Sequence, residues 1–565
     1  MRIGVIGSGP SGIAAAAVLL DKGHQVTILD GGHVPEDWSR KLQQELCLRL
    51  DQGLDPTPDQ WQILRYGPAG SNPDNNTNTT AAPGFLRSLL VRHMPSVLSK
   101  KRILGSTFAF HGIDEGITLS GAGLARSLGV GGLGQVWGAG CFPLRPDEYG
   151  QWPFSQPELE PYLVQAAHLL HLWQQEDGLC HLYPLYGPIQ TNPDHAMFKS
   201  IPLNQRDGDS PAENLIQHWK TQDTALHKAG IAAGRMRLAV QATTGGRDGC
   251  QLCGLCFHGC PYGMIFNGVQ RIRDFQNRDN FTHRPGWFVH RFQEDDHGVT
   301  LEIQAQGRLF RESFDCIILA AGVLSSLRIA ADSLRIWNHP SRLVDNGAVL
   351  MPALARTRQK LGCSPRTFTM AEAAMGIAPH VISKQGVQIS IYSATSIFRY
   401  PLLGLFRALP KSLSNLAARL VGDPIILLIY FHSSDSRGAT ITCQSNDGTT
   451  PGHLVVTPDD TPSPIDNLLP QLLSLLKKNR HATGFVPLPL FMKKTPFGFS
   501  DHLGGSLPMR QNPGILETDF QGRLFGTKKV RVVDASLFPV FPAQNATYVG
   551  MANAMRIADG ITADS

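Results

Sequence analysis

Hydrophobic positions at the start of the chain predict a strand, a helix and a second strand. Residues 1–6 have the apolar pattern of a buried strand, and a glycine-rich turn separates them from an alanine-rich stretch. Residues 26–30 are again mostly apolar and end in an acid, Asp30. A strand, a helix and a strand within residues 1–31 predict one βαβ unit with parallel strands.

The rest of the chain alternates between patterned and irregular stretches. Residues 340–495 mix strand-like and helix-like patterns and contain no motif, whereas the last 65 residues are dense in motifs. Between these parts we expect a glycine-rich segment at 120–141, a helical region at 151–185, a cysteine-rich loop at 250–260, alternating strands at 286–306 and a buried strand with a turn at 316–322.

The first glycine-rich turn has the spacing of a dinucleotide-binding loop. Gly7, Gly9 and Gly12 fit G-x-G-x-x-G between a predicted strand and a predicted helix, which is the context that the motif requires. The first glycine allows the tight turn, the second lets the backbone approach a pyrophosphate, and the third lets helix and strand pack closely. We expect Pro10 and Ser11 beside the phosphates and Asp30 at the ribose hydroxyls.

A second glycine-rich stretch, residues 129–134, also matches the motif but lacks its context. No buried strand precedes it, and Trp137 and Gly138 follow it where a helix should begin. We expect Gly131 and Gly132 to pack as bare backbone against a flat ring. The chain thus has one predicted dinucleotide-binding turn and one segment expected to pack against a flat ring. This combination favours FAD over NAD as the cofactor.

Composition and charge narrow the class of protein. The 565 residues suffice for several interleaved domains, and 42% hydrophobic and 17% charged residues are typical of a globular enzyme. The net charge of +5 comes from dispersed residues, so we expect no nucleic-acid partner. We predict no transmembrane segment, because no apolar run approaches the roughly 20 residues needed. The first residues leave no room for a signal peptide, so we expect a cytoplasmic protein, or one exported only with a partner subunit.

Motifs in family order along the chain resemble those of the GMC (glucose-methanol-choline) oxidoreductases. His502, Gly505, Ser506 and Met509 are similar to the family's H-x-x-G-[TS]-x-x-M motif. The stretches 530–539, 545–547 and 551–559 resemble its closing segment. Residues 130–138, 152–162 and 319–322 add further similarity, and only 340–495 is unmatched.

This resemblance implies an α/β fold in which a GMC-type FAD-binding Rossmann domain is interleaved with an α+β substrate-binding domain. We assign residues 1–340 to the FAD-binding domain, with the cysteine loop at 250–268, residues 341–495 mainly to the substrate-binding domain, and residues 496–565 to a C-terminal FAD and catalytic segment. Beyond the residues above, the implied FAD contacts are Ala321, Asp534, Ala535, Asn545, Ala546 and Thr547.

The resemblance also implies oxidation of a CH–OH group in a sugar, polyol or other alcohol. His502 would take the hydroxyl proton while a hydride passes to flavin N5, and an imidazole suits this task near neutral pH. Asn545 stands where relatives have a second His or an Asn, and would hold the substrate oxygen. Pro508 replaces the family's usual Arg, and residues 545–547 lack the usual Pro after the catalytic Asn, so substrate contacts are expected to differ.

Four cysteines, Cys250, Cys253, Cys256 and Cys260, have the C-x2-C-x2-C-x3-C-P spacing of bacterial ferredoxins. Thiolates so spaced can converge on one soft centre. The loop resembles that of the catalytic subunits of bacterial FAD-dependent glucose dehydrogenases, which implies a three-iron cluster on Cys250, Cys256 and Cys260. Cys253 would complete a 4Fe–4S cluster, which we prefer over 3Fe–4S.

Other interpretations of this loop stay open. A zinc knot would use the same thiolates, although zinc pairs are normally farther apart in sequence. Unliganded thiols are a second option, and disulfides are disfavoured in a cytosolic chain. A similar loop also occurs in long-chain alcohol oxidases.

Three functions follow from these alternatives. A cluster would pass electrons to an acceptor protein or subunit, as in a dehydrogenase. Without a cluster, the chain would be an FAD alcohol oxidase that uses oxygen on a fatty or other lipophilic alcohol. The third option is a non-catalytic electron-transfer flavoprotein.

Overall fold

The structure is a computed structural model that describes residues 1–68, 102–110, 117–119, 126–189, 210–241, 249–356, 368–393, 423–445, 452–498 and 502–562. Residues 120–125 of the expected glycine-rich segment lie outside these ranges. The three expected domains also include residues outside these ranges, whereas every single residue expected to bind FAD, to act in catalysis or to ligate a cluster is described.

A parallel five-stranded sheet lies at the centre of one half of the molecule. Its order is β22 (Val530–Val532), β11 (Cys316–Leu319), β1 (Arg2–Ile6), β2 (Gln25–Asp30) and β7 (Phe281–Pro285). In β1 only Arg2 is exposed, because both faces of the strand are covered. The predicted βαβ unit at the start of the chain is confirmed, as is the buried strand that ends near residue 320.

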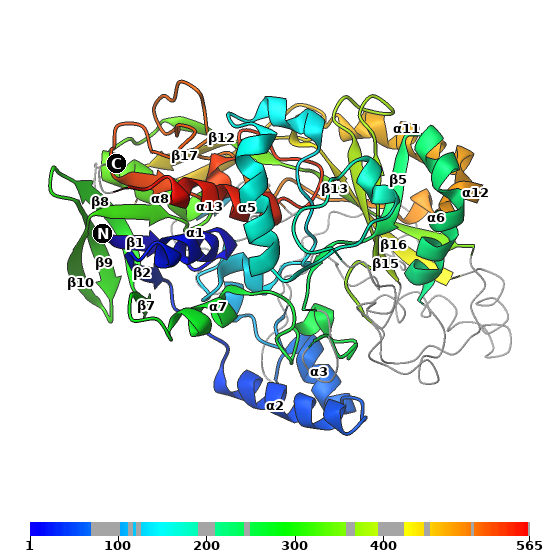
Figure 1. The fold of residues 1–565 in the computed structure, drawn as a ribbon, viewed down its shortest axis with the longest axis horizontal. Helices are drawn as coiled ribbons and strands as arrows, with labels where there is room; N and C mark the ends of the chain where they lie inside the picture. Colours follow the sequence, from blue (N-terminus) through cyan, green and yellow to red (C-terminus); the bar gives the residue numbers. More distant parts are fainter. Residues whose placement is uncertain are drawn as a thin grey trace.

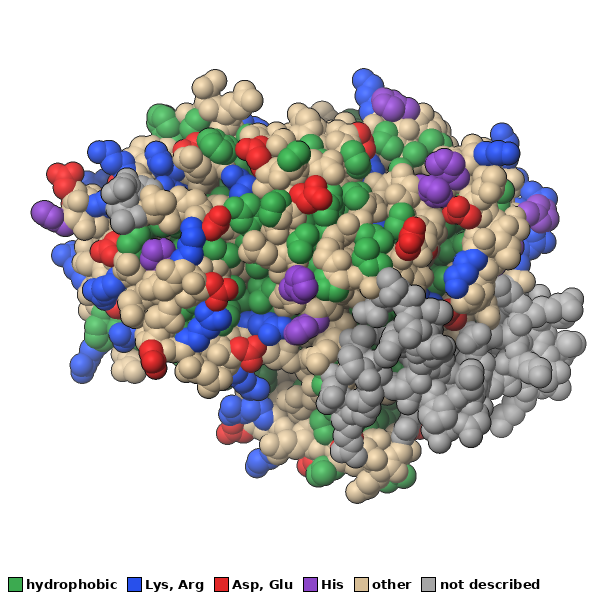
Figure 2. Space-filling model, viewed as in Figure 1, with side chains coloured by type: hydrophobic (Ala, Val, Ile, Leu, Met, Phe, Trp, Pro, Cys, Tyr) green, Lys and Arg blue, Asp and Glu red, His purple; other side chains and the backbone are tan. Residues whose placement is uncertain are grey.

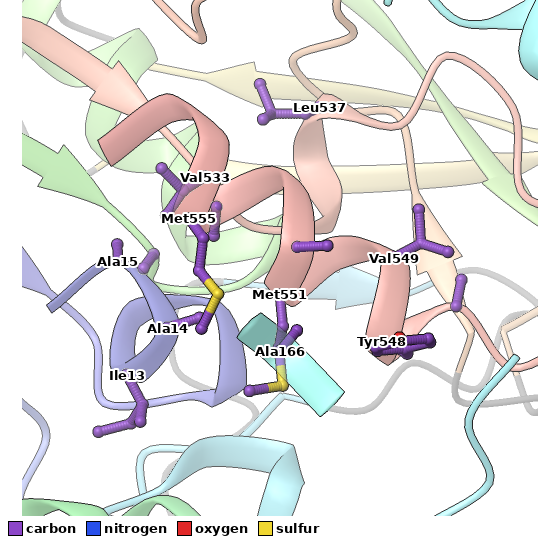
Figure 3. Close-up of a cluster of buried hydrophobic side chains, with 14 of the residues drawn as sticks. Ile13, Ala14, Ala15, Ala166, Val533, Leu537, Tyr548, Val549, Met551 and Met555 are labelled. Atoms are coloured by element: carbon purple, nitrogen blue, oxygen red, sulfur yellow. The ribbon is translucent and has the colours of Figure 1, made fainter. Parts of the chain in front are cut away.

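Three helices from distant parts of the chain pack together beside this sheet. They are α1 (Pro10–Asp21), α5 (Gln156–Leu169) and α13 (Thr547–Asp559). Figure 3 shows the side chains of Met551 and Met555 filling the space beside Ala14 and Ala166. These small residues let the helix backbones approach, and the flexible methionines fill what remains.

Smaller sheets extend this half of the molecule. The antiparallel strands β8 (Phe288–Glu294), β9 (Val299–Ala305) and β10 (Arg308–Phe314) lie at the left edge in Figure 1, and α8 (Val323–Leu334) packs on β8. A mixed sheet has the order β21 (Leu503–Gly504), β12 (Pro340–Asp345), β17 (Ala439–Gln444), β18 (His453–Pro458) and β3 (Ile117–Leu119). Strands β4 (Leu172–Trp173) and β6 (Leu238–Ala239) form a short pair.

An antiparallel sheet of seven strands forms the other half of the molecule (Figure 1). Its main path is β19 (Phe485–Pro487), β13 (Ala348–Ala355), β16 (Asp423–Phe431), β15 (Val387–Ser393), β14 (Ala373–Ile377) and β5 (Ile231–Arg235), and β20 (Lys493–Lys494) pairs with β13. One face packs against α6 (Pro211–Lys228), α11 (Ile465–Lys478) and α12 (Arg480–Thr483). The other face turns toward the candidate site.

The α/β class, with a Rossmann-type unit and a separate antiparallel sheet, is confirmed. The helical region expected at 151–185 ends at Leu169, and a strand and a short 3-10 helix, Gly178–His181, follow. The alternating strands expected at 286–306 are β8 and β9. The domain boundaries remain predictions; β5 precedes residue 340 but belongs to the seven-stranded sheet.

Acidic and basic side chains are interspersed over the face of the molecule shown in Figure 2. Among the helices of the described ranges, none has the length and apolar character that crossing a membrane requires.

Candidate active site

The loop between β1 and α1 needs its three glycines for different steric reasons. Gly7 has a φ of +108°, and a Cβ there would lie 2.2 Å from the Ala320 carbonyl oxygen. A Cβ on Gly12 would lie 2.2 Å from the Gly7 carbonyl oxygen. Gly9 has an ordinary φ of −65°, and a Cβ there would meet no atom within 4 Å. Since Gly9 faces open space, neither backbone conformation nor protein packing requires a glycine at that position.

A ligand that approaches the backbone explains Gly9, and the helix end beside it favours an anion. Gly9 is the N-cap of α1 and supplies no capping side chain, and the first turn contains no acidic residue. The exposed N–H groups and the helix dipole suit a phosphate. The loop therefore fits the pyrophosphate of a dinucleotide.

Asp30 ends β2 at the same edge of the sheet. Its Oδ1 accepts a hydrogen bond from the Gly32 N–H at 3.0 Å, and its Oδ2 lies 3.0 Å from Nε2 of His283 on β7. Both side chains are largely buried. Each carboxylate oxygen keeps a second lone pair, so Asp30 can still accept from a ribose hydroxyl.

The second glycine-rich segment lies directly on the first. The Gly131 N–H donates to Ser8 Oγ at 2.8 Å, and a Cβ on Gly132 would lie 3.3 Å from the Gly9 Cα. Residues Gly132–Gln135 form only a short 3-10 helix, so this segment is not a second βαβ turn. Trp137 donates from Nε1 to the Phe266 carbonyl at 2.9 Å, which ties the segment to the end of the cysteine loop.

Asp534 joins two chain segments at the carboxyl edge of the parallel sheet. Its Oδ2 accepts from the Gly322 N–H at 2.8 Å and from Ser326 Oγ at 2.6 Å, and its Oδ1 accepts from the Ser536 N–H at 2.9 Å. Burial raises the pKa of this carboxyl group, and the hydrogen bonds oppose that rise. Asp534 thereby fixes the turns that hold the neighbouring Ala321 and Ala535.

His502 lies between two aromatic rings next to the seven-stranded sheet. Its imidazole stacks on Phe541 with 5.7 Å between centroids and 10° between planes. Tyr430, on β16, lies 5.0 Å away on a tilted plane. Burial lowers the pKa of His502 to about 4, so the ring is neutral near pH 7.

Two asparagine side chains contact the two ring nitrogens of His502. Asn346 Oδ1 lies 3.1 Å from Nδ1, and Asn545 Nδ2 lies 3.4 Å from Nε2. Asn545 Oδ1 is buried and has no hydrogen-bond partner among the described residues. A neutral imidazole beside an amide can accept a proton and hold a hydroxyl oxygen.

The loop that carries Asn545 rests on a buried ion pair. Gln544 donates from Nε2 to Glu148 Oε2 at 2.5 Å, and Glu148 pairs with Arg145 at 3.1 Å. Ala546 and Thr547 then begin α13, in which Gly550 lies against Ser11 of α1. The loop thus joins the candidate base to the dinucleotide site.

The four cysteines of the loop lie together but form no disulfide. Burial raises the pKa of Cys250, Cys253 and Cys260, and the nearby Cys256 sulfur raises each of them further. The Met264 N–H donates to Cys260 Sγ at 3.3 Å. In the parts of the chain that the structure describes, no three His, Cys, Asp or Glu side chains are grouped so as to hold a metal ion.

Helices α2 (Asp37–Asp51) and α3 (Pro58–Tyr66) cover this loop, below the rest of the molecule in Figure 1. Gln43 donates to the Pro261 carbonyl at 2.7 Å, and His258 Nδ1 lies 3.2 Å from the Leu64 carbonyl. The loop leads into α7 (Gly268–Phe275), and a Cβ on Gly268 would lie 2.5 Å from the Ser8 carbonyl. The loop is therefore tied to the dinucleotide site.

The structure brings the expected residues into two adjoining groups. Gly7, Gly9 and Gly12 share one group with residues 131–132, and His502 contacts Asn545 in the other. No sequence pattern indicated Asn346, Tyr430 or His283, because each acquires its neighbour only in the folded chain. Asn346 lies in the stretch without a motif, so no local pattern could have identified it.

Two comparisons with known proteins found matches to this chain. Residues 436–554 match the family model described as GMC oxidoreductase. The solved structure of pyridoxine 4-oxidase from Mesorbium loti matches 99% of this chain and 98% of its own, with a TM-score of 0.55 and 14% sequence identity. No curated protein sequence gives a significant match.

At 14% identity the solved structure speaks for the fold, while the family match covers the segment that contains His502 and Asn545. The similarity to the glucose dehydrogenase branch rests on the sequence of the cysteine loop alone. Residues 436–554 are therefore similar to the GMC oxidoreductases, and the fold of the chain is similar to that of the solved structure over nearly its whole length.

Proposed function

We propose that this protein oxidises an alcohol with His502 as the base and passes the electrons through an iron–sulfur cluster to an external acceptor. The observation that carries the first part is the pair of neutral side chains, His502 and Asn545, 3.4 Å apart beside the dinucleotide site. Nε2 of His502 takes the hydroxyl proton, and the Asn545 amide holds the hydroxyl oxygen. FAD, when bound, accepts the hydride.

The glycine loop and its neighbours would hold FAD. The N–H groups at the start of α1 bind the pyrophosphate, and Asp30 accepts from the ribose. The remaining part of the cofactor would be held by Trp137 and Gly138, by Ala321, by the turn at Asp534 and Ala535, and by Ala546 and Thr547 at the start of α13.

Replacing the base tests the catalytic part. In His502→Ala, the rate of anaerobic flavin reduction by an alcohol should fall by about 10²- to 10⁴-fold. His432→Gln is the matched control, because His432 is also buried and its pKa is also lowered to about 4. If an alcohol reduces the flavin of His502→Ala as fast as that of the parent protein, His502 is not the base. If no alcohol reduces the flavin of the parent protein, the chain is the non-catalytic flavoprotein.

The sheet beside His502 favours an alcohol with an apolar carbon skeleton among the candidate substrates. Tyr430 shares its face of β16 with Ile426 and Leu428, and the paired positions on β13 are Ala348 and Leu350. A sugar would leave hydroxyl groups unpaired against such side chains. The kcat/KM for flavin reduction should rise about fourfold per methylene from ethanol to hexanol, and faster reduction by glucose than by hexanol would favour the sugar.

The cysteine loop supplies the donors for a cluster. Its four sulfurs are buried or nearly so, and backbone N–H groups of the loop point at Cys250, Cys253 and Cys260. A 4Fe–4S cluster binds each thiolate at a different iron, so its ligands stand farther apart than those of one zinc ion. The described cysteines are not grouped closely enough to bind one metal ion. This spacing is therefore compatible with a cluster, in which each thiolate binds a different iron. Such a centre would carry single electrons.

Purification without oxygen, followed by iron and sulfide analysis and electron paramagnetic resonance, tests this part. Four irons per flavin are expected, and three would indicate the smaller cluster. A protein that contains flavin but no iron, and that makes hydrogen peroxide from an alcohol, would instead be the oxidase. Pyridoxine 4-oxidase is an oxidase by name, so oxygen consumption should be measured in the same preparation.

A further inference from the structure

We propose that Asn346 is a positioning residue that fixes the proton of His502 on Nδ1 and leaves Nε2 as the single proton acceptor. This inference rests on the proposed role of His502 as the base. Asn346 lies in the turn between β12 and β13 and is completely buried.

The orientation of the Asn346 amide follows from its own partners. Its Nδ2 lies 3.3 Å from the Pro542 carbonyl oxygen and 3.4 Å from the Ala543 carbonyl oxygen. Both partners are acceptors, so the NH₂ end of the amide must face them. Oδ1 is then the atom that faces Nδ1 of His502, at 3.1 Å.

An amide oxygen can only accept, so the imidazole nitrogen opposite it must carry the hydrogen. In a neutral ring the other nitrogen, Nε2, then carries no hydrogen and can accept a proton. Asn545 Nδ2 lies on that side, which agrees with a lone pair there. The tautomer thus follows from four contacts: those of Asn346 Nδ2 with two carbonyls, of Asn346 Oδ1 with Nδ1, and of Asn545 Nδ2 with Nε2. It requires no assumption about the reaction.

The turn around Asn346 is itself fixed, so the amide cannot easily rotate away. Asp345 accepts from the Gly498 N–H at 2.7 Å, and the Gly347 N–H donates to Ser436 Oγ at 3.0 Å. The two carbonyls that bind Asn346 belong to the loop that continues to Asn545. One amide therefore sets the geometry of both His502 and Asn545.

The tautomer can be measured directly in the FAD-bound full chain. Nitrogen NMR of the protein labelled with ¹⁵N-histidine distinguishes Nδ1–H from Nε2–H, and His502→Gln identifies the signal of His502. We expect Nδ1–H in the parent protein, and an Nε2–H signal there would overturn the inference without any variant at Asn346.

Two variants of Asn346 test the effect on the reaction. Asn346→Leu should let Nε2–H appear and slow anaerobic flavin reduction by about 10- to 100-fold. Asn346→Asp should restore the acceptor and move the acid limb of the pH profile upward by about one unit or more. Among the described residues, Tyr430 is a titratable side chain that packs on the ring, and burial is the cause of the low pKa of His502.

Asn280 is the matched control, because it also donates from Nδ2 to two carbonyls, those of Leu20 and His24, at 3.1 and 2.9 Å. Asn280→Leu should leave the His502 signal and the pH profile unchanged. An unchanged His502 signal in Asn346→Leu would refute the positioning role. If the expected tautomer is present but no alcohol reduces the flavin, the proposed function fails while the role of Asn346 stands.

Discussion

Two glycines of the dinucleotide loop are expected to serve different purposes: Gly12 is needed for the packing of the fold, and Gly9 for the binding of the ligand. Gly12→Ala places a Cβ 2.2 Å from the Gly7 carbonyl oxygen, so it should destabilise the protein by about 1–3 kcal/mol. Gly9→Ala meets no protein atom within 4 Å and should leave the unfolding temperature of the apoprotein unchanged. It should weaken FAD binding by about tenfold or more, since that space is needed by the pyrophosphate.

Thermal unfolding of both apoproteins and titration with FAD measure the two effects. Equal loss of apoprotein stability in both variants would show that Gly9 serves packing and not a ligand.

The acid limb of the activity profile should report His502. Because burial lowers its pKa to about 4, the imidazole stays neutral and able to accept a proton well below the usual value near 6.5. We expect kcat/KM for alcohol to be constant from neutral pH down to about 5 and to fall below it as His502 becomes protonated. A limb centred near 6.5 would contradict this assignment.

At the scale of single residues, the sequence identifies those whose neighbours are close along the chain. Gly7, Gly9 and Gly12 act within one turn, so their spacing suffices. His502 and Asn346 are 156 positions apart, and their contact depends on how β12 and β21 pair. No periodic pattern encodes such a pairing, and the role of Asn346 required the folded chain.

At the scale of elements, the buried ion pair of Arg145 and Glu148, which contacts the loop that carries Asn545, should contribute both to stability and to activity. Glu148→Leu leaves the buried Arg145 without its buried partner and removes one of the two acceptors of Gln544 Nε2, the other being the Pro143 carbonyl. Asp147 remains beside Arg145, so we expect a loss of about 3 kcal/mol in unfolding free energy. Flavin reduction should also slow, because Gln544 precedes Asn545.

Chemical denaturation and single-turnover kinetics check this prediction. Glu302→Leu removes a more exposed ion pair with Arg291 and should cost less than about 1 kcal/mol without slowing the reaction. Similar losses of unfolding free energy and of reaction rate in both variants would argue against a special role of Glu148 in holding the loop that carries Asn545.

Elements with a strong local pattern were predictable, and elements defined by long-range pairing were not. The first βαβ unit and the strands β8 and β9 follow from apolar periodicity. Helix α5 is shorter than expected because the chain turns at Leu170 to form β4, whose partner β6 lies far along the chain, at Leu238–Ala239. The seven-stranded sheet combines β5 with strands after residue 340, and sequence order gives no sign of this.

At the scale of the whole molecule, Cys253 would decide the type of the proposed cluster. Cys253→Ser should convert a 4Fe–4S centre to a three-iron centre, because three thiolates remain at the spacing that holds the smaller cluster. Electron paramagnetic resonance of the oxidised protein would then show a new signal, with FAD content unchanged. A spectrum and an iron content identical to those of the parent protein would show that Cys253 is not a ligand.

The contact between α1 and α13 also constrains how the protein is made. Helix α1 is synthesised first, yet it packs against a helix more than 500 residues later in the sequence. A nascent chain therefore carries the apolar side of α1 without this partner for almost the whole time on the ribosome. We expect the FAD-binding half to close only after translation is nearly finished, so chaperones and free FAD should limit the yield of active enzyme.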